Sequence, residues 1–246
     1  MTLPADSWRL KKEHKLGVLG KYLSDFGSLL FPDICQACGT SLSQQENHFC
    51  TTCLHQFPYT NFHVNADNRL AKQFWGRVNI SSAAAYLYFN KGGQVQNIMH
   101  QLKYNNQPQV GVAIGQLYAA ELKKQESYQQ AQAILPVPLH PHKIEKRGYN
   151  QSEQFAIGLS EVLEIPVYTD ILSRDSERES QAKQNRSHRF ENMQKVFSAQ
   201  SNGVGLENIL LVDDTITTGA TLEACVIALQ EIGVKNIHIL GIAFTE

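Results

Sequence analysis

Long hydrophobic runs are absent from the sequence. None of its 246 residues lies in a stretch of about 18 consecutive apolar residues, the length that marks a membrane-spanning helix. The first 15 residues, MTLPADSWRLKKEHK, also lack the order of basic, apolar and small residues found in a secretory signal peptide. We therefore expect a cytoplasmic protein with no transmembrane segment.

The sequence also lacks an excess of either positive or negative charge. The formal net charge of −1 excludes a surface that is basic all round, so any contact with nucleic acid would use a local basic patch. The hydrophobic content of 42% and charged content of 18% are typical of a globular protein and exclude a disordered chain. The length is sufficient for one core of ordinary size and a small additional module.

The apolar pattern of the second part of the chain predicts alternating strands and helices. Two strands, ILPV at 134–137 and ILLV at 209–212, are continuously apolar, which indicates burial on both faces. We therefore predict an α/β fold with a mostly parallel sheet flanked by helices. The predicted strands cover residues 81–89, 133–137, 166–168, 208–212 and 237–243, and the helices cover 94–103, 110–122, 152–163 and 222–232.

The N-terminal part has a different character. Apolar residues at helical spacing predict an amphipathic helix over residues 16–30, which ends before Pro32. Residues 40–68 are polar and rich in Asn, Gln and His, which indicates a loop around a small site rather than core. We place a boundary near residue 65, between a first unit (1–65) with this helix and a cysteine site and an α/β domain (66–246).

Four of the five cysteines form two closely spaced pairs. Cys35 and Cys38 are separated by two residues, as are Cys50 and Cys53, and eleven residues lie between the pairs. Such pairs typically hold one tetrahedral zinc ion. The alternatives are unlinked core cysteines and a redox-active pair, but a redox motif needs only one pair. We predict a structural zinc site held by these four cysteines. His48 and His55 are close enough in the sequence to replace one thiol, although such histidines are more often surface residues, and Cys225 is predicted to be a buried core residue.

Residues 213–221 (DDTITTGAT), which we call the phosphate loop, follow an apolar strand and lead into a helix. Hydroxyls, a glycine and backbone N–H groups at a helix start form a site for a phosphate group. Adjacent carboxylates accept hydrogen bonds from vicinal ribose hydroxyls. The alternative is an ordinary helix cap, which explains neither the paired acids nor the threonines. The predicted ligand-binding residues are Asp213, Asp214, Thr215, Thr217, Thr218, Gly219, Ala220 and Thr221.

The phosphate loop resembles the motif of type I phosphoribosyltransferases, which bind phosphoribosyl diphosphate (PRPP). That resemblance implies PRPP with Mg²⁺ as the ligand and a phosphoribosyltransferase-like domain. The sequence departs from the purine-salvage members at one position. Those members carry an acid that acts as a base toward the purine, and this chain has Thr217 there. The ATPase motif G-x-x-x-x-G-K-[ST] is missing from the sequence.

Two further segments carry charge near this predicted site. The basic segment 139–151 follows the strand at 133–137, and its residues Lys146, Arg147 and Gly148 are candidates for contact with the pyrophosphate group of PRPP. The alternative is a solvated basic loop. The polar segment 173–197 has the composition of a mobile cover for the ligand, or of a plain loop.

The motifs occur in an order that resembles the ComF/GntX family. The ordered set comprises the cysteine pairs, HQLKY at 100–104, VPLH at 137–140, RGYNQ at 147–151, Gln181, Arg186, Asn192, Phe197 and the phosphate loop. One departure is the segment NNQ at 105–107, where a small or acidic turn is expected. The resemblance implies a competence protein for natural transformation, with a role in DNA uptake and in handling single-stranded DNA at the inner membrane.

Two functions remain open at this point. In the first, the protein is a non-metabolic competence factor that binds PRPP and interacts with single-stranded DNA or with DNA-uptake proteins at the inner membrane, where it associates peripherally. In the second, it is an active phosphoribosyltransferase in nucleotide salvage or in modification of another acceptor. Both need the phosphate loop. The sequence contains no recognisable set of residues for reading an acceptor base, so it does not decide whether catalysis occurs.

Overall fold

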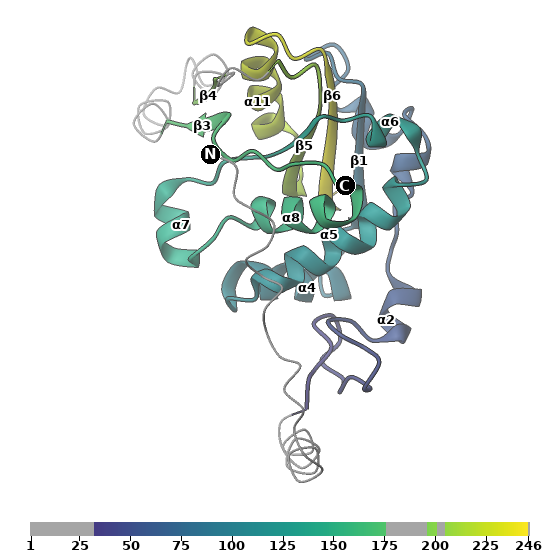
Figure 1. Cartoon of the computed structure of the whole chain (residues 1–246). Helices are drawn as coiled ribbons and strands as arrows, with labels where there is room; N and C mark the ends of the chain where they lie inside the picture. The colour runs from purple at the N-terminus through teal and green to yellow at the C-terminus, as the bar shows by residue number, and fades with distance from the viewer. Residues whose placement is uncertain (1–31, 176–195, 201–204, 246) are drawn as a thin grey trace.

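A four-stranded parallel sheet forms the centre of the molecule (Figure 1). The computed structural model describes residues 32–175, 196–200 and 205–245. Three parallel pairings give the strand order β1-β6-β5-β2, in agreement with the predicted mostly parallel sheet. The predicted strand at 166–168 is reduced to a single bridge between Val167 and Ile134. The strands are β1 (Ser82–Tyr88), β2 (Ala133–Pro136), β5 (Asn208–Ile216) and β6 (Asn236–Phe244).

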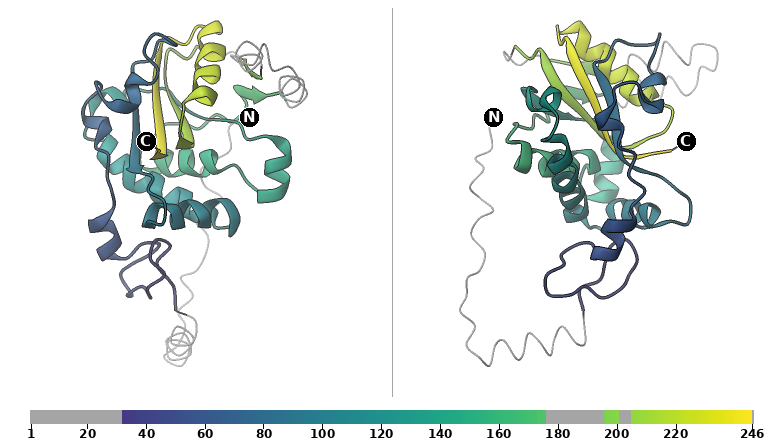
Figure 2. Two further views of the ribbon diagram at one scale, coloured as in Figure 1. Left: turned by 180° about the vertical axis from the view of Figure 1, so that it is seen from behind. Right: turned by 90° about the vertical axis from the view of Figure 1, so that its right-hand side faces the viewer.

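Helices cover both faces of this sheet, as predicted. Figure 2 shows α5 and α8 on one face, whereas α11 lies on the other. The backbones of α5 and α8 approach closely, because a Cβ atom at Gly158 would lie 2.0 Å from the carbonyl oxygen of Val112. None of the described helices combines the length and apolarity needed to cross a membrane. The helices are α4 (Gln94–Tyr104), α5 (Pro108–Leu122), α6 (Glu126–Gln129), α7 (Pro141–Arg147), α8 (Gln151–Leu163) and α11 (Ala220–Glu231).

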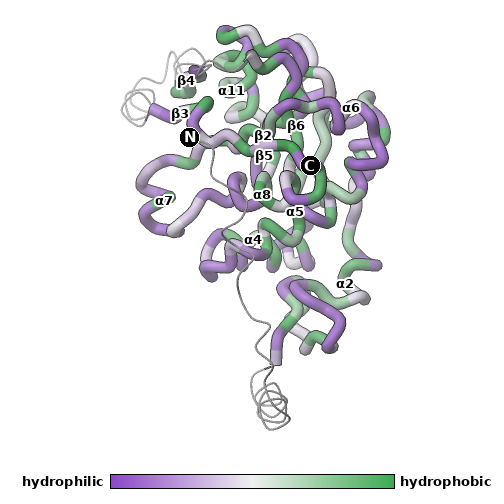
Figure 3. Tube along the Cα trace, in the orientation of Figure 1, coloured by the Kyte–Doolittle hydropathy of each residue, from purple (hydrophilic) through white to green (hydrophobic). Residues whose placement is uncertain are grey.

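The polar segment 40–68 contributes to the core, so the expectation of a loop without core residues is wrong. It contains α2 (Thr51–Gln56) and η1 (Phe62–Val64), and α3 (Arg69–Lys72) follows it. Phe49, Phe57 and Phe62 are buried among the polar residues, and Phe62 packs edge-on against Tyr88 of β1. Their apolar area requires burial even though the surrounding composition is hydrophilic, as the alternating colours of this segment in Figure 3 illustrate.

Two segments predicted as loops contain secondary structure. The basic segment 139–151 contains α7, which ends at Gly148 with a φ of 80°, so it is partly helical rather than a loop. The ends of the polar segment 173–197 form a small antiparallel pair, β3 (Leu172–Arg174) with β4 (Phe197–Ala199). The helix predicted over 16–30 and the motif residues Gln181, Arg186 and Asn192 lie outside the described residues. The boundary near residue 65 stays a prediction.

Candidate functional site

The phosphate loop lies at the carboxyl edge of the sheet, where parallel α/β sheets bind ligands. Strand β5 continues through both aspartates to Ile216, and α11 begins at Ala220. Gly219 between them has a φ of 73°, a left-handed conformation that strains any residue with a Cβ atom. A small hollow here is lined by Asp213, Thr215, Ile216, Thr217, Thr218, Gly219, Ala220, Thr221 and Leu222. The structure thus brings almost all of the predicted ligand-binding residues together around one hollow.

Two residues that follow α3 support the turn from beneath, and sequence reasoning missed both. A Cβ atom at Gly219 would lie 2.8 Å from Cζ of Phe74, so the buried phenyl ring packs directly against the glycine. Arg77 donates a hydrogen bond of 3.2 Å to the carbonyl oxygen of Thr218 and forms an ion pair with Glu223. These contacts join segments about 140 residues apart. They fix the backbone of the turn while leaving Thr217 and Thr218 exposed.

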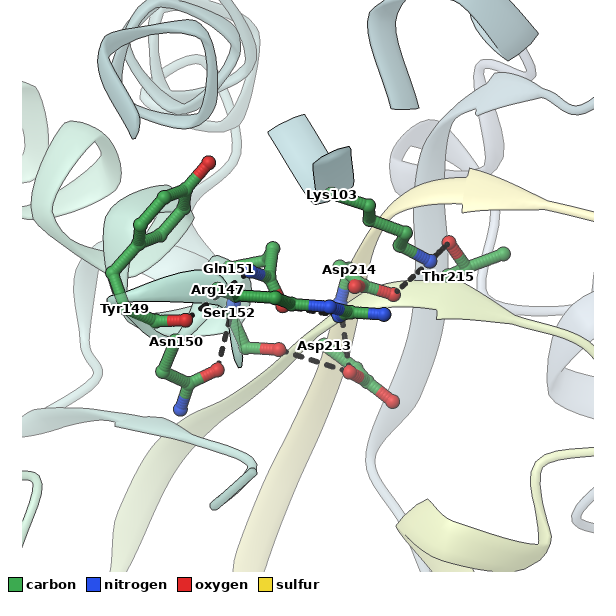
Figure 4. Close-up of polar contacts among 9 residues, drawn as sticks. All are labelled: Lys103, Arg147, Tyr149, Asn150, Gln151, Ser152, Asp213, Asp214 and Thr215. Carbon is green, nitrogen blue, oxygen red and sulfur yellow. Dashed lines mark hydrogen bonds and ion pairs between the residues drawn. The ribbon is translucent and has the colours of Figure 1, made fainter. Parts of the chain in front are cut away.

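The two aspartates of the loop have different partners (Figure 4). Asp213 accepts a hydrogen bond of 2.9 Å from the Ser152 hydroxyl and one of 2.8 Å from the backbone N–H of Asp214. Asp214 pairs with Lys103, whose ammonium nitrogen lies 3.0 Å from a carboxylate oxygen and 3.0 Å from the Thr215 hydroxyl. Lys103 lies at the end of α4 and Ser152 at the start of α8. Three elements therefore converge on the acid pair.

Burial raises the pKa of Asp213 to about 7, and the neighbouring charge of Asp214 acts in the same direction. The backbone N–H of Asp214, the Ser152 hydroxyl and the Lys103 ammonium partly oppose this rise, because each favours the ionised carboxylate. Asp213 consequently changes its protonation near neutral pH, which is common at functional sites.

The segment 147–152 mainly holds other elements in place. Arg147 donates a hydrogen bond of 2.6 Å to the Gln151 side chain. Asn150 donates one of 3.0 Å to the carbonyl oxygen of Val137, and its side-chain oxygen accepts one from Ser152 N–H, which caps α8. Lys146 is exposed on α7. The pyrophosphate contacts of Lys146, Arg147 and Gly148 stay a prediction, and Ser152 is the residue here whose side chain reaches the acid pair.

The four predicted zinc ligands form one cluster. The Sγ atoms of Cys35, Cys38, Cys50 and Cys53 all lie within 4.8 Å of one another, and those of Cys38 and Cys50 are 3.8 Å apart. Tetrahedral zinc with bonds of about 2.3 Å requires sulfur separations of about 3.8 Å, so the residues present fit the metal. In the described part of the chain this cluster consists of the four cysteines alone, without a histidine. Cys225 is buried in α11, as predicted.

Several polar groups orient the sulfurs. Backbone N–H groups of Cys50 and Cys53 point at Sγ atoms of Cys35 and Cys50 over 3.3 and 3.4 Å. The Gln94 side chain, at the start of α4, lies 3.4 Å from Cys53 Sγ. Gly39 after the first pair has a φ of 78°, the conformation expected for such a turn. Donors of this kind stabilise thiolates and fix the geometry of a metal site.

The fold and site define the class: an α/β protein with a mostly parallel sheet, a phosphate loop at its carboxyl edge and a four-cysteine cluster that could hold a metal ion. Competence protein F of Haemophilus influenzae is 28% identical over 220 residues, which cover 85% of this chain and 96% of that protein. Competence protein ComFC of Streptococcus pneumoniae is 27% identical and ComFC of Bacillus subtilis is 26% identical, each over 83% of this chain and 84% and 82% of those proteins, respectively. These relatives confirm the predicted resemblance to the ComF/ComFC family. No family model matches.

Solved structures with partial likeness include a PRPP amidotransferase and phosphoribosyltransferases. Glutamine PRPP amidotransferase from B. subtilis has a TM-score of 0.37 and 20% identity, over 58% of this chain and 30% of that protein. Orotate phosphoribosyltransferase from Aeropyrum pernix has a TM-score of 0.32 and 12% identity, over 72% of this chain and 77% of that protein. Because these scores are low, the fold class rests on the strand order and pairing described above.

Proposed function

We propose that this chain is a competence protein for natural transformation that binds PRPP at the phosphate loop. The single observation that carries the PRPP assignment is the hollow between β5 and α11, which combines the Asp213 carboxyl group with a threonine-rich turn at a helix start. The competence role is supported by relatives named for competence in three bacteria. Single-stranded DNA and inner-membrane DNA-uptake proteins are the partners that this role implies.

Each part of the loop would bind a different part of PRPP. The backbone N–H groups and hydroxyls from Thr217 to Thr221 would hold the 5-phosphate, since a helix start favours a phosphate anion. Asp213 and Asp214 would accept hydrogen bonds from the ribose hydroxyls. Lys146 and Arg147 would meet the pyrophosphate with positive charge, and Gly148 leaves room for close approach of the backbone. Mg²⁺ bound with PRPP would neutralise part of the phosphate charge.

The cysteine module, residues 35–53, has a structural role in this proposal. Four cysteine ligands complete a tetrahedral zinc site and leave no open position for a substrate. An active transferase is the second candidate function, because a carboxyl group with a pKa of about 7 lies in the ligand site at Asp213. The two functions differ in whether pyrophosphate is released when an acceptor base is added.

Calorimetry with PRPP and Mg²⁺ tests the ligand assignment. The wild-type protein should bind PRPP, and the double variant Asp213→Asn/Asp214→Asn should bind at least about a hundredfold more weakly, because two charge-assisted hydrogen bonds are weakened. Asp67→Asn is the control, since Asp67 forms an exposed ion pair with Lys72 outside the loop. Affinity of the double variant within threefold of wild type would refute the assignment, as would absence of binding by the wild-type protein.

A genetic experiment tests the biological role. Deletion of the gene in a naturally transformable host should abolish transformation and leave growth and nucleobase salvage normal. The wild-type gene should restore transformation, whereas the Asp213→Asn/Asp214→Asn double variant should not. Full restoration by the double variant would mean that PRPP binding is dispensable for DNA uptake. A deletion strain that transforms normally but cannot use an external nucleobase would instead favour the transferase.

A further inference from the structure

Helix α4 touches both the cysteine module and the ligand site. Its first turn faces the cysteines and its last turn carries Lys103 to the acid pair. The helix has 11 residues, so its ends are about 15 Å apart at a rise of about 1.5 Å per residue. Figure 1 shows α4 between the segment that contains α2 and the lower edge of the sheet.

At its N-terminal end, α4 contacts both cysteine pairs. The Gln94 side chain points its amide at Cys53 Sγ of the second pair over 3.4 Å. One turn later, the Asn97 amide donates a hydrogen bond of 2.8 Å to the carbonyl oxygen of Ala37, which lies between the cysteines of the first pair. A metal that draws the two pairs together would therefore fix the start of α4 on both sides.

At its C-terminal end, Lys103 is the group that orients Asp214. The ammonium lies between the Asp214 carboxylate and the Thr215 hydroxyl, and both side chains of the ion pair are largely shielded, with exposures of 21% and 14%. The carbonyl oxygen of the preceding Leu102 accepts a hydrogen bond from the Tyr149 hydroxyl, which ties the same turn to the segment before α8. A shift of α4 would thus move the charge that stabilises the acid pair.

The helix is fixed to the core along its length. Val95, Ile98, Met99 and Leu102 are all buried, and they line one side of the helix at helical spacing. Packed interiors transmit small displacements because they have little free space. A movement at the first turn of α4 is therefore passed to the last turn rather than absorbed between them.

We infer that α4 couples the cysteine module to the ligand site, with Gln94 and Asn97 as the anchors at the metal and Lys103 as the positioning residue at the acid pair. This inference rests on the proposed function, because PRPP is the ligand whose affinity would report the coupling. Binding of zinc and binding of PRPP then strengthen each other. By thermodynamic linkage, each ligand changes the affinity of the other by the same factor.

The first experiment tests the positioning role of Lys103. Lys103→Met should weaken PRPP binding about tenfold, Lys103→Arg should restore most of it, and the control Lys124→Met should bind like wild type, since Lys124 pairs with Glu121 at the surface. The loss in Lys103→Met should be larger at pH 7 than at pH 9, because the ammonium helps to keep Asp213 ionised. A loss of the same size at both pH values would indicate a merely structural role and overturn this part.

The second experiment measures release of zinc to a chelator in the full chain. Saturating PRPP with Mg²⁺ should slow zinc release severalfold in wild type, but not in Gln94→Ala/Asn97→Ala, which retains all four cysteines, nor in Lys103→Met. If wild type binds PRPP and its rate of zinc release is unchanged, the coupling is refuted while the proposed function stands. If wild type binds no PRPP, the proposed function itself fails, and the two failures are therefore distinguished.

Discussion

Replacement of Gly219 by alanine should damage the phosphate loop for two separable reasons. Gly219 has a φ of 73°, which costs an L-residue about 1–2 kcal/mol. Its added Cβ would also lie 2.8 and 2.9 Å from two atoms of the Phe74 ring, closer than real Cβ atoms approach. Overpacking of a filled interior typically costs about 1–3 kcal/mol. We expect Gly219→Ala to lower the free energy of unfolding by about 2–5 kcal/mol.

A matched glycine separates the two costs. Gly233 has a φ of 94°, but a Cβ there would meet no atom within 4 Å. Gly233→Ala should therefore show only the conformational cost of about 1–2 kcal/mol. Urea unfolding of both variants gives the two free energies, and the difference between them is the cost of the contact with Phe74. Because the turn must shift to relieve that contact, Gly219→Ala should also lose PRPP affinity, whereas Gly233→Ala should not.

A double-mutant cycle checks the physical cause. Phe74→Leu removes ring atoms that face the new methyl group, so in the Gly219→Ala background it should cost less than it does in the wild-type background. Equal unfolding free energies for Gly219→Ala and Gly233→Ala would refute the argument from crowding. Strictly additive effects of the Phe74 and Gly219 substitutions would do the same, because additivity means that the two positions do not interact.

Two further predictions concern the metal and the acid pair. Wild-type protein should contain about one zinc ion per chain, and Cys50→Ser should lose it and become sensitive to proteolysis within residues 35–53. The control Cys225→Ser, outside the cluster, should keep its zinc. Elemental analysis measures the zinc content, and equal zinc in both variants would contradict the prediction. Burial raises the pKa of Asp213 to about 7, so the ionised form destabilises the ligand-free fold and stability is lost as pH rises from about 4 through 7. Asp213→Asn should therefore raise Tm most at pH 8 and progressively less toward pH 4, and a Tm difference that does not vary with pH would be the contrary result.

The sequence was sufficient to predict the elements whose burial is local and continuous. The apolar strands at 133–137 and 208–212 and the helix at 152–163 agree with β2, the first part of β5 and α8. The sequence predicts a loop at residues 213–216, but these residues extend β5. The reason is tertiary, since Asp213 and Thr215 pair with Gly241 and Ala243 of β6, and this neighbouring strand outweighs the low strand propensity of aspartate.

The unpredicted helix α7 had local signals that the charge of the segment obscured. Pro141 lies in its first turn, the His140 ring accepts a hydrogen bond from His142 N–H, and Gly148 terminates the helix. Proline at the start and glycine past the end are ordinary helix boundaries. The high content of Lys and Arg favours a loop, but the boundary signals at both ends outweigh composition and the segment forms a helix.

The contacts that complete the candidate ligand site cannot be predicted from the sequence, for a different reason. Ser152 and Lys103 reach the acid pair across sequence separations of 61 and more than 100 residues, and Phe74 lies below the turn from a segment that had no predicted function. A local motif specifies which groups a ligand needs. It does not specify which distant groups hold them, because those depend on how strands and helices come together.

The segment 147–152 also contains residues that hold other groups in place. The charge of Arg147 predicts contact with a ligand, but its guanidinium lies 5.7 Å from the centre of the Tyr104 ring and donates a hydrogen bond to the Gln151 side chain. Asn150 joins the end of β2 to the start of α8, and the capped α8 presents Ser152 to Asp213. The order of residues in this motif is thus explained by the need to position Ser152 beside the acid pair.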